Sequence, residues 1–180
     1  MANKKLAARE KMLRTMGEFI LENGLGAASL RPLAKAADTS DRMLIYHFGS
    51  KQKLLAELLE YLAHELQAQL NAALPLRPAR SANKLLTEIV GLLRQEPFCR
   101  YMRLWLEIVA AASRGSEVHR EVGGRIIDGF QQWLNERLPT KLDNPADTQA
   151  IIFLATEGSL VLDAIGRAEL SDKGLKKILR

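Results

Sequence analysis

Residues 29–51 read SLRPLAKAADTSDRMLIYHFGSK, and this stretch predicts two short helices joined by a tight polar turn. Ser29 can cap the first helix, in which Leu33 and Ala34 form an apolar face. The Asp, Thr and Ser at 38–40 favour a turn, and Ser40 can cap a second helix that ends near Phe48. Two such helices packed on a longer preceding one form a helix-turn-helix.

Helical periodicity continues on both sides of this motif. Before it, Leu6, Leu13, Met16 and Ile20 predict an amphipathic helix that ends at Asn23-Gly24. After it, leucines at 54, 55, 58, 62 and 66 predict the inner face of a long helix over 51–73. Beyond a proline-containing break at 74–78, we expect helices at about 81–95, 98–113, 117–138, 145–166 and 172–179, the last capped by Ser171-Asp172. The fold class is therefore expected to be all-α.

Composition excludes several classes of protein. The chain has 180 residues, of which 47% are hydrophobic and 26% charged, as in ordinary globular proteins. Its longest apolar run, at 159–165, is too short to cross a bilayer, and its first five residues do not form an apolar signal core. Cys99 is the only cysteine, which excludes an intrachain disulfide. A cytoplasmic location without a membrane partner is therefore expected.

The positive charge is concentrated in the first third of the chain. Residues 1–53 hold ten Lys or Arg and five Asp or Glu, whereas residues 54–180 hold sixteen of each. The net charge of +5 therefore belongs to the segment that contains the helix-turn-helix. Such an asymmetry favours contact with a polyanion, although a solvated basic face without a partner would give the same count.

In a helix-turn-helix the second helix lies in the major groove of DNA, with its N-terminal residues at the base edges. Arg42 can donate two hydrogen bonds to guanine, Met43 can contact a thymine methyl, and Asp41 can accept from cytosine. Leu44 and Phe48, four residues apart, are expected to face the core instead. The side chains predicted to face DNA from this helix are Asp41, Arg42, Met43, Tyr46 and His47.

Two lysines stand where a helix disfavours cations. Lys51 and Lys53 fall in the first turn of the helix that Ser50 can cap, at the positive end of the helix dipole. A phosphate at this end would accept hydrogen bonds from the backbone N–H groups and from the lysines. We interpret the pair as a phosphate anchor, while two exposed lysines without a function remain the alternative.

The segment from about Leu13 to Leu59 resembles the DNA-binding domain of the TetR family of transcriptional regulators. The resemblance depends on FILENG at 19–24, SLRPLA at 29–34, AADTS at 36–40 and LIYHFGSK at 44–51. The last block is the most specific, because a His-Phe-x-Ser-Lys step between two helices is rare elsewhere.

The resemblance implies a homodimeric, ligand-responsive repressor. Its helix-turn-helix DNA-binding domain would span residues 1–50, and its helical ligand-binding and dimerisation domain residues 51–180. The implied partners are a double-stranded DNA operator, a second copy of the chain and an unidentified small-molecule effector, with no cofactor.

Site residues can be carried over from the family by position. The match implies that Arg31 contacts the DNA backbone, that Arg42, Met43 and His47 face the groove, and that Lys51 anchors a phosphate. Two departures stand out: Asp38 replaces the usual turn glycine, and the family's DNA-contacting tyrosine, normally two residues before the histidine, is replaced by Ile45, with Tyr46 following it. Ser29 and Ser40, at the two helix starts, complete the predicted DNA-binding set.

An effector site is expected on the helices between residues 81 and 138. Large apolar and aromatic side chains there could surround a cavity that also holds a polar group such as Glu107. Ordinary core packing explains any single one of them equally well. The predicted lining residues are Phe98, Met102, Trp105, Leu106, Val109, Phe130 and Trp133.

The segment at 146–166 is apolar nearly all round. A helix of that kind needs two partners, so we expect it to pack on its own chain and on a second copy. Gly158 would allow close approach of the second helix. The predicted interface residues are Ala150, Ile151, Phe153, Leu154, Gly158, Leu160 and Val161.

Catalytic and metal sites are not expected. The three histidines at 47, 64 and 119 share no ligand spacing, no serine lies in a nucleophile-elbow pattern, and Glu107 and Glu157 lack an obvious catalytic partner.

Two hypotheses about function remain open. One is an effector-controlled DNA-binding repressor, and the other is a ligand-binding helical protein whose N-terminal motif does not bind DNA.

Overall fold

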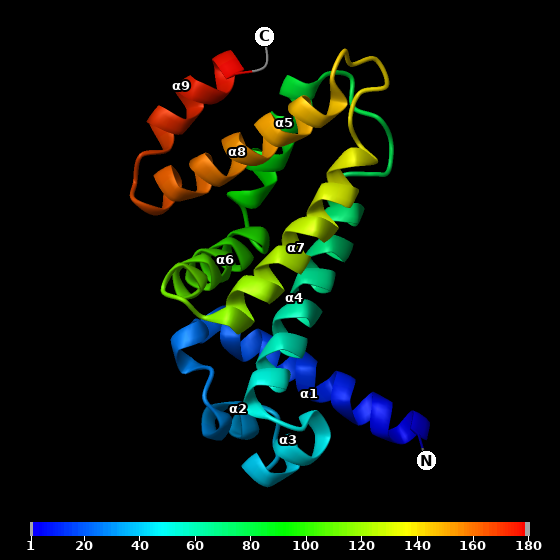
Figure 1. Ribbon diagram of the computed structural model, residues 1–180, viewed down its shortest axis with the longest axis vertical. Helices are drawn as coiled ribbons and strands as arrows, with labels where there is room; N and C mark the ends of the chain where they lie inside the picture. The colour runs from blue at the N-terminus through cyan, green and yellow to red at the C-terminus, as the bar shows by residue number, and fades with distance from the viewer. Residues whose placement is uncertain (1, 179–180) are drawn as a thin grey trace. The chain divides into compact units, whose positions relative to one another are not determined.

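A computed structural model describes residues 2–178 of the chain, with side chains from residue 6 onward. Within that range every regular element is helical, which confirms the all-α prediction. Figure 1 shows their order along the chain. The elements are α1 (Ala2–Asn23), the short 3-10 helix η1 (Leu25–Ala27), α2 (Leu30–Ala36), α3 (Asp41–Phe48), α4 (Lys51–Ala73), α5 (Ala82–Leu93), α6 (Phe98–Ser113), α7 (Glu117–Asn135), α8 (Pro145–Ala164) and α9 (Ala168–Ile178).

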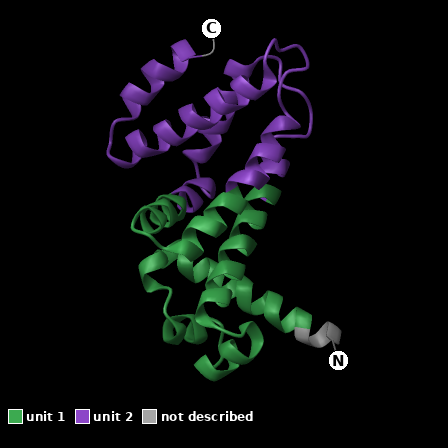
Figure 2. Cartoon of the chain, in the orientation of Figure 1, with its two compact units in different colours: residues 1–68, 103–126 green, residues 69–102, 127–180 purple. Residues whose placement is uncertain are grey.

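The chain forms two compact units (Figure 2). Unit 1 comprises residues 1–68 and 103–126, and unit 2 comprises residues 69–102 and 127–180. Helices α4, α6 and α7 each contribute residues to both units. The expected domain boundary at residue 50 therefore differs from the division by compactness, and it stays a prediction about function.

Unit 1 contains α1, α2, α3, most of α4 and parts of α6 and α7. Met16, Ile20, Leu44, Leu54 and Leu58 are fully buried in its core. At Gly17 an added Cβ would lie 2.9 Å from Leu62 Cδ2, so glycine lets this leucine pack closely against α1. The helix-turn-helix is thus held against a continuous apolar core.

The turns around α3 follow the predicted capping pattern. Ser40 Oγ accepts a hydrogen bond from the N–H of Met43 at 3.3 Å, and Ser50 Oγ accepts one from the N–H of Lys53 at 3.2 Å. Asp38, which replaces the family's turn glycine, has a φ of 50°. Aspartate tolerates this left-handed conformation better than most residues, so the tight turn persists without glycine.

In unit 2, α5, α8 and α9 pack on one another (Figure 1). Arg94, which follows α5, ties the three helices together because its guanidinium donates to Asp163 at 2.7 and 3.0 Å and to Asp172 at 2.7 Å. It also donates to Ser171 Oγ at 3.1 Å. The two carboxylates stabilise the charged form, and the hydrogen bond to Asp163 is the main reason that the pKa of Arg94 is raised.

Four details of the expected fold are wrong. Helix α9 begins at Ala168 rather than at a Ser171-Asp172 cap, because both side chains interact with Arg94 instead. Helix η1, after the predicted helix end at Asn23-Gly24, was not expected, and the side chain of Ser29 does not cap α2. Leu6, expected on the buried face of α1, is 66% exposed, since spacing along one helix does not show how far its neighbours extend.

Trp133 and Arg137, at the end of α7, are buried in a network of polar contacts within unit 2. Arg137 is 2% exposed, and its guanidinium donates to the carbonyls of Trp133 and Leu74 and to Asn71 Oδ1. Its Cζ lies 4.2 Å from the ring centroid of Trp133, whose Nε1 also donates to Asn71. This network joins the end of α4 to the end of α7.

No helix in the described range combines the length and apolarity needed to cross a membrane.

Candidate nucleic-acid interface

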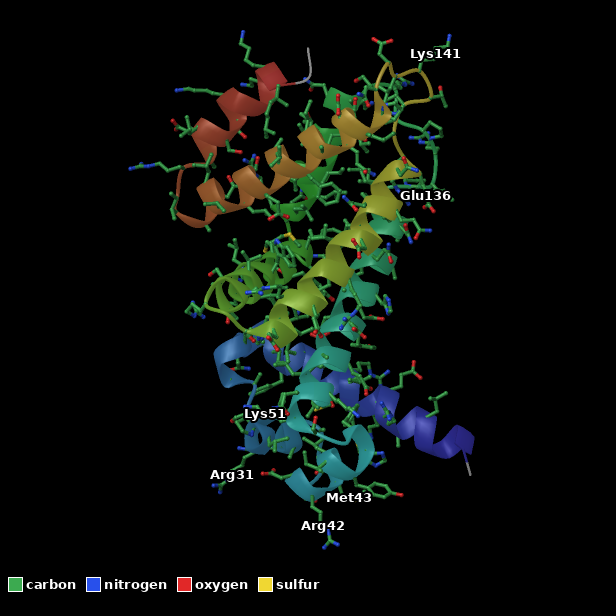
Figure 3. All side chains as sticks on the ribbon, viewed as in Figure 1. Arg31, Arg42, Met43, Lys51, Glu136 and Lys141 are labelled. Atoms are coloured by element: carbon green, nitrogen blue, oxygen red, sulfur yellow. The ribbon has the colours of Figure 1, made fainter. Side chains whose placement is uncertain are left out.

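Helix α3 has one face in the core and one in solvent. Leu44 and Phe48 are 0% and 3% exposed, which confirms the predicted inner face. On the opposite face Asp41 and Arg42 are exposed, and Met43 is 39% exposed. Figure 3 shows Arg42 and Met43 pointing away from the surrounding helices. The outer face therefore offers a carboxylate, a guanidinium and a thioether within one helical turn.

The second turn of α3 presents a tyrosine. Tyr46 is 65% exposed, while Ile45 is half-buried. The shift of the tyrosine by one position thus leaves it on the solvent side of the helix. His47 is half-buried, and its ring lies edge-on to that of Tyr46 with centroids 5.3 Å apart. Of the predicted groove-facing residues, His47 is the least accessible.

Basic and hydroxyl side chains flank α3. Lys51 and Lys53 are exposed in the first turn of α4, which contains no acidic residue. Arg31 is exposed on α2, as Figure 3 shows. Ser29 is exposed at the N-cap position of α2, but its side chain does not cap the helix. These residues and the outer face of α3 all belong to unit 1.

The predicted effector-site residues do not fall within one unit. Trp105, Leu106 and Val109 belong to unit 1, and Val109 is 43% exposed. The other predicted lining residues belong to unit 2, where Phe98 is 7% and Trp133 4% exposed. They are Phe98, Met102, Phe130 and Trp133. The effector site stays a prediction.

The predicted dimer residues divide between the two faces of α8. Leu154 is 73% and Val161 51% exposed, and Ala150 and Gly158 are exposed on the same side. Leu160 is 8% exposed and therefore packs within its own chain, while Ile151 and Phe153 are half-buried. An apolar stripe thus remains in solvent along α8, as a helix with two partners requires.

Sequence reasoning missed two charged side chains, Glu107 and Arg9, that make polar contacts around the helix-turn-helix. Glu107 Oε2, on α6, accepts a hydrogen bond from the N–H of Leu25 at 2.7 Å. Arg9, on α1, donates to the carbonyl of His47 at 2.8 Å and pairs with Glu57 on α4. None of these contacts has a local sequence signal, because the partners lie 38 to 82 residues apart.

The sequence around the helix-turn-helix matches a known family. Residues 18–58 match the family described as bacterial regulatory proteins, tetR family. The matched segment, which contains the helix-turn-helix, is similar to this family. The matched TetR-family segment covers α2, α3 and the first turns of α4, which carry the exposed residues described above.

A curated regulator is also similar in sequence to this chain. The HTH-type transcriptional regulatory protein RaaS from Mycobacterium tuberculosis is 26% identical over 136 residues. The aligned part is 76% of this chain and 59% of RaaS, so the chain spans about three fifths of that relative.

Solved structures share the fold of this chain. A transcriptional regulator from Rhodococcus sp. Rha1 has a TM-score of 0.69 at 19% identity, covering 94% of this chain and 92% of its own. EbrR, described as a multidrug binding protein complexed with proflavin, has a TM-score of 0.68 at 21% identity, covering 96% and 99%.

Proposed function

We propose that this chain is a sequence-specific DNA-binding repressor of transcription. The observation that carries the proposal is the division of α3 into a buried apolar face and an exposed polar one. Leu44 and Phe48 fix the helix to its domain, while Arg42 and Met43 extend into solvent. A helix presented in this way fits the major groove of B-DNA, where each base pair has a distinct pattern of donors and acceptors.

The exposed side chains of α3 and its N-cap residue contact either base edges or the DNA backbone. Arg42 donates two hydrogen bonds to a guanine, Asp41 accepts one from a cytosine, and Met43 packs on a thymine methyl. Ser40 accepts from the N–H of Met43, which leaves its hydroxyl proton to donate to a phosphate. Tyr46, 65% exposed one turn later, is long enough to reach the adjacent backbone.

Phosphates on either side of the groove bind the flanking residues. Lys51 and Lys53 stand at the N-terminus of α4, where backbone N–H groups and the helix dipole favour an anion. Arg31 and Ser29 serve the same purpose at the start of α2. Such contacts set the register of the protein on DNA without reading sequence.

The active form is a homodimer. The exposed stripe of Ala150, Leu154, Gly158 and Val161 on α8 is apolar, and a second copy related by a two-fold axis would cover it. Two recognition helices would then lie about 34 Å apart and enter successive major grooves. The operator is accordingly expected to be a pseudo-palindrome.

A mostly apolar small molecule controls the repressor by binding within residues 81–138 and lowering the affinity for DNA. The likeness in fold to EbrR, which was solved with proflavin, supports an effector of this kind. Glu107 can pass a ligand-induced movement of α6 to the helix-turn-helix, because its carboxylate accepts a hydrogen bond from the N–H of Leu25 just before α2. The effector acts as a switch if its binding free energy for the free protein is about 1–3 kcal/mol more favourable than for the DNA-bound protein.

Selection of duplexes from a randomised pool tests the DNA-binding part of this proposal. The selected duplex is expected to bind roughly 10³-fold more tightly than an unrelated one at the same salt concentration. Equal affinities would instead favour a ligand-binding helical protein whose N-terminal motif does not read DNA. For the effector, a ligand that perturbs the fluorescence of Trp105 or Trp133 should bind the DNA complex more weakly than the free protein.

A further inference from the structure

One guanidinium joins three helices around the end of α3. Arg9, on α1, donates from Nη1 to the carbonyl of His47 at 2.8 Å. Its Nη2 pairs with Glu57 Oε2 on α4, and its Cζ lies 4.8 Å from the ring centroid of Phe48. The Arg9 and Glu57 side chains are 30% and 37% exposed. Arg9 lies upstream of residues 18–58, the segment that matches the tetR family.

The carbonyl that Arg9 reaches is one that a helix leaves unsatisfied. His47 is in the last turn of α3, where carbonyl groups lack an intrahelical donor and the helix dipole is negative. A guanidinium satisfies that carbonyl, neutralises Glu57 and stacks on Phe48 at the same time, because its donors form a rigid planar fork. A lysine ammonium lacks this planar fork, so it is expected to make fewer of the three contacts.

Helix α3 needs such a restraint because it is short and bounded by turns. It has eight residues, and the chain enters it after Asp38 at a φ of 50° and leaves it through Gly49 at a φ of 83°. Leu44 and Phe48 are its buried side chains. Contacts to base edges require the reading helix to be held within about 0.5 Å and 10–20° of the productive geometry.

We propose that Arg9 is a positioning residue that fixes the orientation of α3 by clamping its C-terminal end to α1 and α4, and that this sets the selectivity of DNA binding. The inference rests on the proposed function. Its guanidinium acts inside the protein, so Arg9 does not bind a DNA phosphate.

Replacement of Glu57 separates positioning from simple electrostatics. Glu57→Gln removes a negative charge from unit 1, which contains the helix-turn-helix, so an electrostatic effect would raise the affinity for every duplex. Loss of the clamp has the opposite consequence. Glu57→Gln and Arg9→Gln are each expected to lower the affinity for the selected duplex by about tenfold, the size of one hydrogen bond to a charged group. Arg14→Gln, which removes an exposed charge from the same helix, is the matched control.

The experiment measures affinity for a selected and an unrelated duplex at several salt concentrations, with hydrogen exchange of the amides at 44–49. Both clamp variants should lower the ratio of selected to unrelated affinity more than Arg14→Gln does. The slope of log affinity against log salt concentration should be the same as for Arg14→Gln. Hydrogen exchange should accelerate more in α3 than in α1 and α4. Arg9→Lys should resemble Arg9→Gln, and full recovery by lysine would overturn the proposal.

Three further results would also overturn it. Glu57→Gln could raise or leave unchanged the affinity for the selected duplex. Arg9→Gln could make the salt slope shallower by about one phosphate contact, which would make Arg9 a DNA ligand. Exchange could rise equally in α1, α3 and α4, which indicates a global loss of stability. If the wild-type chain selects no duplex, the proposed function fails, whereas the exchange measurement still tests the clamp.

Discussion

Glu107 and Leu25 are joined by a hydrogen bond of 2.7 Å from the backbone N–H of Leu25 to the carboxylate. Gly24, just before Leu25, has a φ of 79°, and a Cβ there would lie 2.9 Å from the same carboxylate. Glycine is therefore favoured at position 24, both by the positive φ and by the closeness of the Glu107 carboxylate. Helix α6 is thus fixed to the segment that leads into α2.

Replacement of Glu107 should destabilise this junction. Glu107→Ala leaves a part-buried N–H without its acceptor, which costs about 1–3 kcal/mol of the free energy of unfolding. Glu107→Gln keeps an oxygen at the same place and should cost less. Urea unfolding of the two variants measures the difference, with Glu121→Ala, at an exposed position of α7, as the control. A Glu107→Ala protein as stable as this control would show that the hydrogen bond is unimportant in solution.

The role of Lys51 as phosphate anchor predicts a change in salt dependence. Lys51→Ala should weaken binding to all duplexes alike and make the slope of log K against log salt shallower by about 0.9. Lys141→Ala, at an exposed lysine of unit 2 labelled in Figure 3, should leave the slope unchanged. Titrations at four or more salt concentrations give the slopes. If Lys51→Ala kept both the affinity and the slope of the wild type, the assignment would fail.

Arginine substitutions on the exposed stripe of α8 should give monomers. Leu154→Arg and Val161→Arg place a charge at positions that are 73% and 51% exposed in the single chain, so the protomer itself should still fold. Leu160 is unsuitable for this test because it is 8% exposed and packs internally. Sedimentation should show dimers for the wild type and for a Gln132→Arg control, at an exposed position of α7. A wild-type monomer at micromolar concentration would contradict the dimer.

Stability should fall in weak acid because of His119. Burial, followed by the nearby charge of Arg114, lowers the pKa of this histidine from its ordinary value of 6.5. The unfolded chain therefore binds a proton at a pH where the folded chain does not, so the free energy of unfolding decreases as the pH falls below about 6.5. The imidazole of His119 is also held by a hydrogen bond of 2.6 Å between its Nδ1 and Ser116 Oγ. Unfolding curves between pH 7.5 and 5 should show a smaller decrease for His119→Gln than for the wild type, and equal decreases would exclude His119 as the cause.

The local parts of this molecule could be predicted from the sequence. Caps at Ser40 and Ser50 and the apolar pair Leu44 and Phe48 depend on neighbours within four residues, so spacing and residue type are enough to place them. The outer face of α3 follows from the inner one, because helical geometry fixes both. Its roles toward DNA remain predictions.

The contacts between distant segments could not be predicted. Arg94, Arg137 and Glu107 are charged residues that a sequence pattern assigns to the surface, yet each fixes one element to another through partners more than sixty residues away. Their partners become neighbours only when the helices pack. The start of α9 was misplaced for the same reason, since Ser171 interacts with Arg94 rather than capping its own helix.

Base preference of the wild type and of Arg42→Ala tests the central claim, that the exposed face of α3 reads DNA sequence. Affinities are measured for the selected duplex and for all its single base-pair substitutions at one salt concentration. Arg42→Ala is expected to lose about 1–3 kcal/mol on the selected duplex and to lose discrimination at one base pair in each half-site, with the other positions unchanged. A uniform loss at every position, or an unaltered preference profile, would contradict the assignment of α3 as the reading helix.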